Sequence, residues 1–205
     1  MENFILGFES NLSQYPMREI LFWILEMGLL YFIIGRFIEK RSIVKDYFHL
    51  IRYASLKKWW MRLCGKVFLL CVLGILLLFF IAIVFQYIGQ FDNIPSVAMT
   101  VRAYMLYLAN VTLFSFLMIL IINCWNEERI SFAIVILMEI FSLYGGIISS
   151  SLTCYLPGSI AMYRRSSWYV MEGFQATGLL TVEIGVAVTI FRFGYKGLER
   201  GKRNG

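Results

Sequence analysis

The sequence predicts an all-α integral membrane protein with about five transmembrane helices. Hydrophobic residues make up 60% of the 205-residue chain and charged residues 16%, whereas soluble domains average roughly 45–50% and about 25%. Several apolar segments also approach the roughly 20 residues that a helix needs to cross a bilayer. We therefore expect a single transmembrane domain over residues 1–205, in a multi-pass protein of the cell membrane.

Five apolar segments fit such helices. The first contains Glu26 and ends near Arg36, whereas the second is uninterrupted by any charge. Asn110 lies within the third, Glu139 near the centre of the fourth and Glu183 within the fifth. The expected spans are about residues 20–38, 67–85, 103–122, 131–149 and 178–195. Two longer segments, 39–66 and 150–177, are expected to lie outside the membrane.

Basic residues are concentrated on one side of this arrangement. Residues 36–66 contain nine of the chain's 19 lysines and arginines, and the tail from Arg192 contains five more. Loops rich in lysine and arginine stay in the cytoplasm, so we expect segment 39–66 and the C-terminus to be cytoplasmic. Five spans then place the N-terminus outside. Segment 150–177 becomes external, and its mixed character predicts short helices lying at the membrane surface.

Tryptophans lie near several of the expected span ends. Tryptophan is enriched at both membrane–water interfaces, where one end of the ring is apolar and the other is wet. We therefore interpret four of them as interfacial anchors: Trp23, Trp59, Trp60 and Trp168.

Three carboxylates lie within expected spans: Glu26, Glu139 and Glu183. A charge at bilayer depth costs several kcal/mol, so such residues usually face the bundle interior or water. With the N-terminus outside, Glu26 and Glu183 fall in the outer part of the membrane, level with Arg102. One interpretation is an acidic substrate path for a cationic cargo, with Glu26, Arg102, Glu139 and Glu183 as candidates. The other is a structural role, in which Glu26 or Glu183 pairs with Arg102.

The sequence contains no recognisable nucleotide or metal motif. No GxxxxGK[ST] phosphate loop occurs, so we expect no ATPase activity and no cofactor bound by this chain. Cys64, Cys71, Cys124 and Cys154 form no CxxC and have no histidine at ligand spacing, so no metal site is expected. Topology accounts for the basic residues without nucleic acid. A membrane-embedded Cys–His peptidase using His49 and Cys64 stays open, although no motif surrounds either residue.

Two stretches resemble a known family. Residues 51–60, IRYASLKKWW, precede a long apolar span and look like the cytoplasmic loop of small ABC-2-type permeases. Such permeases occur with peptide-antibiotic export or immunity systems in Gram-positive bacteria. Residues 155–166, YLPGSIAMYRRS, are similar to the external segment before the last span of those permeases. The ABC-2 fold implies six spans, and this chain would match spans two to six. Residues 1–18 do not supply the first, so either the subunit is short or another chain completes the bundle.

The resemblance implies a permease subunit that moves a peptide or amphiphile. A separate ATP-binding cassette subunit would carry ATP and Mg²⁺, and a second permease subunit, of the same or a different chain, would complete the transporter. Arg52, Lys57 and Lys58 would meet an acidic surface of the ATP-binding subunit, and Tyr53 would fill a groove. Closure of that subunit would then move the segment and tilt the spans. Alternatively, segment 39–66 only sets topology and binds anionic lipid, in a non-transporting immunity or scaffold protein.

Overall fold

The part of the chain that the structure describes is all-helical, as the sequence predicts. A computed structural model describes residues 17–41, 55–88, 96–125, 127–148, 161–167 and 175–203. These residues form five α-helices and a short 3-10 helix. The elements are α2 (Met17–Glu39), α4 (Leu56–Ile88), α5 (Val97–Trp125), α6 (Glu128–Ile148), η3 (Tyr163–Arg165) and α8 (Ala176–Arg203).

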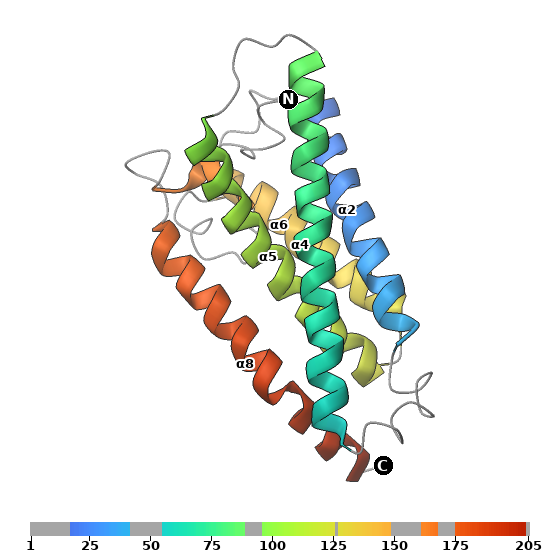
Figure 1. The fold of residues 1–205 in the computed structure, drawn as a ribbon. Coiled ribbons are helices and arrows are strands. Elements are labelled where there is room, and N and C mark those ends of the chain that lie inside the picture. Colours follow the sequence, from blue (N-terminus) through green and yellow to red (C-terminus); the bar gives the residue numbers. More distant parts are fainter. Residues whose placement is uncertain are drawn as a thin grey trace.

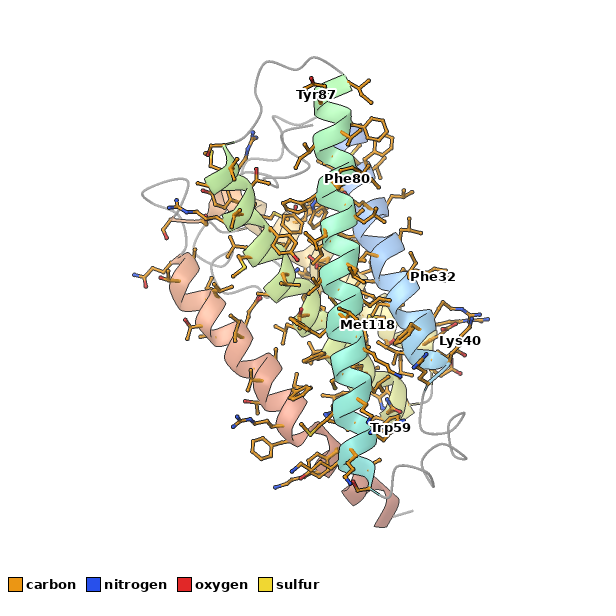
Figure 2. All side chains as sticks on the ribbon, viewed as in Figure 1. Phe32, Lys40, Trp59, Phe80, Tyr87 and Met118 are labelled. Carbon is orange, nitrogen blue, oxygen red and sulfur yellow. The ribbon has the colours of Figure 1, made fainter. Side chains whose placement is uncertain are left out.

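The five α-helices alternate in direction, so the start of α2 and the end of α8 lie at opposite ends of the bundle (Figure 1). Contacts agree with this arrangement, because Arg36 near the end of α2 meets Glu128 at the start of α6. We call the end that holds this pair the basic end. The described basic residues there are Arg36, Lys40, Arg41, Lys57, Lys58, Arg62, Lys66, Arg129, Arg192 and Lys196. In Figure 2, Lys40 and Trp59 lie toward this end and Tyr87 toward the other.

Helix α5 is the centre of the bundle. It contacts α2, α4, α6, α8 and η3. Two-thirds of its most apolar 18-residue stretch (67%) is buried, against 28% for α4 and 17% for α8. A helix that is hydrophobic on all sides is stable only when its neighbours or lipid cover it. Protein therefore covers most of α5, whereas α4 and α8 turn most of their surface outward.

Among the described residues, four helices are long and apolar enough to cross a membrane: Ile20–Glu39, Leu56–Phe85, Val97–Trp125 and Ala176–Lys196. They contain the first, second, third and fifth expected spans. Helix α6 covers the fourth expected span but is not among the four. It begins with Glu128 and Arg129, holds Glu139 inside, and has described side chains only as far as Tyr144.

Large apolar side chains cover the outer faces of the bundle. Phe32 on α2, Phe80 on α4 and Val182 on α8 are each more than half exposed, and the first two are labelled on the helices in Figure 2. A continuous apolar surface of this kind is costly in water and marks a membrane or protein contact. Its extent over three helices fits a lipid environment.

Helix α4 begins earlier than the sequence analysis expects. The prediction places a loop up to residue 66, but the helix starts at Leu56 and is 33 residues long. The Ser55 hydroxyl accepts a hydrogen bond from the Lys58 backbone N–H (3.3 Å), as an N-cap residue does. At 1.5 Å per residue the helix is about 50 Å long, well beyond a hydrocarbon core of about 30 Å. The basic first three turns of α4 therefore extend the spanning helix.

Trp60 is a core residue, so its prediction as an interfacial anchor is wrong. Its side chain is fully buried. The indole N–H donates to the Phe191 carbonyl (3.0 Å) and the Ile190 carbonyl (3.3 Å). Gly194, one turn further along α8, provides the space: a Cβ atom there would lie 2.3 Å from Trp60 Cζ2. Trp60 thus joins the start of α4 to the last part of α8.

The same correction applies to two further tryptophans. Trp59 is buried, and Trp23 is buried with its indole N–H donating to the Tyr107 hydroxyl of α5 (3.0 Å). Trp168 lies outside the described residues. Sequence position near a span end is shared by interfacial and buried tryptophans, so it does not separate the two.

Part of segment 150–177 is packed into the bundle. Ala161, Met162, Tyr163 and Ser166 are buried, and η3 contacts α5. The Ser167 hydroxyl accepts a hydrogen bond from the Ala176 backbone N–H at the start of α8 (3.3 Å). The prediction of a segment lying at the surface is therefore wrong for residues 161–163 and for Ser166. Residues 150–160 and 168–174 lie outside the described structure.

Candidate functional site

A polar cluster lies in the interior of the bundle, around Glu139 of α6. The Glu139 side chain is buried, and its Oε1 atom accepts two hydrogen bonds. One comes from the Tyr31 hydroxyl of α2 (2.7 Å) and the other from Asn110 Nδ2 of α5 (2.8 Å). Three helices that are distant in sequence therefore converge on one carboxyl oxygen.

Glu183 of α8 belongs to the same cluster. It is buried, and it interacts electrostatically with Glu139 and with the Tyr31 hydroxyl. We call Tyr31, Asn110, Glu139 and Glu183 the carboxylate cluster. Neither glutamate forms an ion pair with any residue that the structure describes.

Three oxygen atoms of the cluster have no hydrogen-bond partner. They are Glu139 Oε2, Glu183 Oε2 and Asn110 Oδ1, and all three are buried. A buried polar group without a partner costs about 1–3 kcal/mol, and a charged one costs more. Because native structures pair nearly all such groups, the cluster is a candidate binding site.

Glu26 lies apart from the carboxylate cluster, at a small pocket between α2, α4 and α5. The pocket has room for about one water molecule. It is lined by Glu26, Met27, Ile75, Leu78, Phe79, Ala82 and Tyr107. Two of these lining residues pack against each other, the Tyr107 ring edge-on against Phe79 with centroids 5.6 Å apart.

Arg102 is also separate. It is exposed on the first turns of α5, at the end of the bundle opposite the basic end. Within the described part of the chain it pairs with neither Glu26 nor Glu183. Of the four substrate-path candidates, Glu139 and Glu183 are both buried and interact electrostatically, whereas Glu26 and Arg102 lie elsewhere.

The candidate coupling residues are described only in part. Lys57 and Lys58 are exposed on the first turn of α4. Arg52, Tyr53 and His49 lie outside the described residues. Cys64 is fully buried on α4 and faces the core.

An ion-pair network joins α2 to α6 at the basic end. Arg36 Nη1 lies 2.8 Å from Glu39 Oε2 and 2.8 Å from Glu128 Oε1. The Arg36–Glu39 spacing of three residues is a helical-neighbour signal that the sequence carries. The Glu128 contact, 92 residues away in the chain, has no such local signal.

Comparison of the chain with protein-family models, curated proteins and solved structures finds no match. The class of protein therefore follows from the fold and the site alone. The chain is an all-helical bundle of membrane-protein character, with four helices able to span a bilayer. Its interior holds a polar cluster that the described residues leave partly unpaired.

Proposed function

We propose that the chain is a permease subunit of an ATP-driven, ABC-2-type transporter that moves a peptide or amphiphile across the cell membrane. The observation that carries this proposal is the start of α4. Exposed Lys57 and Lys58 stand on a helix that continues without a break into its spanning part. A partner that binds these lysines could therefore move the membrane-spanning part of α4 by moving its first turn.

The contacts of α4 would pass such a movement directly to the neighbouring helices of the bundle. Trp60 hydrogen-bonds the α8 backbone, and α8 packs along α5. A displacement of the basic start of α4 would therefore move α8 together with it and shift both against α5. Transmission through packed helices of this kind is a known way for a partner to switch a membrane-spanning core.

The partners follow from the same proposal. An ATP-binding cassette subunit would supply ATP and Mg²⁺ at the basic end, and a second permease subunit, of the same or a different chain, would complete the transporter. Lipid would cover the remaining apolar surface of α2, α4 and α8. No nucleic acid is involved in this mechanism.

The proposed topology places the basic end in the cytoplasm, with all five helices crossing the membrane. The N-terminus is then outside and the C-terminus is cytoplasmic. The distribution of lysine and arginine supports this orientation, because most of the described basic residues lie at one end of the bundle.

Cysteine accessibility tests the topology. In a variant with Cys64, Cys71, Cys124 and Cys154 replaced by serine, single cysteines are introduced by Lys57→Cys or Val97→Cys. A membrane-impermeant maleimide applied to intact cells is expected to label position 97 and to leave position 57 unlabelled. Inverted membrane vesicles should give the reverse pattern. Labelling of position 57 in intact cells would contradict the proposed orientation.

Co-purification tests the coupling role. Replacing Arg52, Lys57 and Lys58 together by glutamate should reduce recovery of an ATP-hydrolysing partner at least tenfold, because the substitutions reverse the charge of the contact. The matched control is Arg192→Glu with Lys196→Glu, two exposed residues at the basic end of α8, which should leave recovery unchanged. If the partner were recovered equally well with both variants, the proposed coupling role of Arg52, Lys57 and Lys58 would be wrong. If no ATP-hydrolysing partner co-purified with the unmodified protein, the proposed function would be wrong.

The other candidate functions gain no support from the site. A peptidase nucleophile must reach its substrate, and Cys64 is fully buried. Full activity after His49→Ala and Cys64→Ala would exclude the Cys–His peptidase. A non-transporting immunity or scaffold protein would keep its function in cells that lack the ATP-binding partner.

A further inference from the structure

The carboxylate cluster has more hydrogen-bond acceptors than donors. Both donors that reach Glu139, the Tyr31 hydroxyl and Asn110 Nδ2, bind the same oxygen, Oε1. Glu139 Oε2 is left without a donor, and so are Glu183 Oε2 and Asn110 Oδ1. An additional donor or a cation is needed to pair these oxygens.

No side chain of the described residues supplies a compensating positive charge. Tyr31 of α2 interacts electrostatically with both glutamates and with Cys71 of α4. Tyr107 of α5 interacts with Glu139 and with Glu26. The Cys71 thiol already donates to the Ser115 hydroxyl (3.3 Å). All of these groups are neutral or acidic. Two ionised carboxylates would therefore repel each other in the interior of the membrane, where even one is costly.

We propose that Glu139 and Glu183 form a proton-binding site in the membrane interior, occupied at neutral pH, in which Asn110 and Tyr31 orient Glu139. A proton taken from the aqueous phase binds Glu139 Oε2, since Oε1 already accepts two hydrogen bonds. The protonated carboxyl is neutral and supplies the missing donor. Asn110 Oδ1, fully buried and unpartnered at the same carboxyl, provides a further acceptor for it.

A proton fits the cluster better than a metal ion. Among the described residues, no group of three or more His, Cys, Asp or Glu side chains is arranged to hold one. Hard cations such as calcium and magnesium take about six to eight oxygen ligands, and this cluster offers three unpartnered oxygens. A proton needs one donor oxygen and one acceptor.

The site draws one carboxyl group from α6 and one from α8, and the two interact electrostatically. With the proton bound, at most one of the two carboxyl groups carries a charge. With the proton lost, two like charges repel each other. This inference goes beyond ATP-driven transport and does not depend on it, because it follows from the buried oxygens alone.

Infrared spectroscopy of the purified full-length chain tests the proposal. The experiment records the carbonyl band of protonated carboxyl groups at neutral pH in a Glu26→Gln background, which removes the other intramembrane acid. The band is expected in this background, and either E139Q or E183Q should abolish it or reduce it at least twofold. The control is E128Q, at the exposed Arg36 pair, which should leave the band unchanged.

Three outcomes would overturn the proposal. The first is absence of the carbonyl band at neutral pH, and the second is persistence of the band in a double E139Q/E183Q variant. The third is loss of the band on adding sodium chloride but not on adding choline chloride. That loss would show that a metal ion, in place of a proton, occupies the site. If E139Q does not fold, the proposal is tested by comparing the carbonyl band of the E26Q protein with that of E183Q in the same background. Loss of ATPase co-purification would leave this result unaffected, so the two proposals fail separately.

Discussion

Trp60→Ala is expected to lower the free energy of unfolding by about 3–5 kcal/mol, the range for truncating a buried tryptophan to alanine. The side chain is 0% exposed, and its loss also frees the carbonyls of Ile190 and Phe191. Reversible unfolding of the detergent-purified protein in increasing sodium dodecyl sulfate measures the change. Trp125→Ala is the matched control, because Trp125 is 59% exposed and its loss should cost less than about 0.5 kcal/mol.

The same contact can be tested from the α8 side. A Cβ atom at position 194 would lie 2.3 Å from the Trp60 ring, and overpacking of this kind costs about 1–3 kcal/mol. Gly194→Ala should therefore destabilise the protein. Gly185→Ala, on the same helix with nothing within 4 Å, should be neutral or slightly stabilising. Equal stability of the two alanine variants would mean that Trp60 does not pack against α8.

The fold class could be predicted because membrane-spanning helices are encoded locally. A run of apolar residues such as 67–85 satisfies its own backbone hydrogen bonds and needs no distant partner. The start of α4 could not be predicted in this way. Lys57, Lys58, Trp59 and Trp60 are compatible with an interfacial loop as well as with a helix. What stabilises the helical alternative is the contact with Gly194, which lies 134 residues further along the chain.

The two glutamates of the candidate site were predictable, but Tyr31, Asn110 and the geometry were not. The sequence shows that Glu139 and Glu183 lie at bilayer depth, because depth follows from position within an apolar run. It does not show which way each side chain faces, because a helix that is apolar on all sides has no amphipathic direction. The hydrogen bond from Tyr31 spans 108 residues of sequence. The level of Arg102 along the membrane suggested a pairing with Glu26 or Glu183, whereas Glu183 is buried and interacts electrostatically with Glu139.

Asn110→Asp should produce a loss of stability that grows as the pH rises. The substitution keeps the shape of the side chain but replaces the donor 2.8 Å from Glu139 Oε1 with an acceptor. An aspartate at the centre of a membrane helix costs about 2.5–3.5 kcal/mol on insertion scales, and a loss of this size is expected at alkaline pH. At acidic pH the new carboxyl is neutral and can donate to Glu139, so the loss should be small.

Unfolding measured at several pH values checks this result, with Asn123→Asp as the control. Asn123 is a part-buried asparagine near the end of the same helix, and its Nδ2 donates to the Ile119 carbonyl (2.7 Å). It lies away from the carboxylate cluster, so the cost of its replacement should rise less with pH than that of Asn110→Asp. A pH-independent cost for Asn110→Asp would mean that a third acid can ionise beside Glu139 without penalty. That outcome requires water or a cation at the cluster, because two carboxylates in contact are stable inside a bilayer only when something neutralises them.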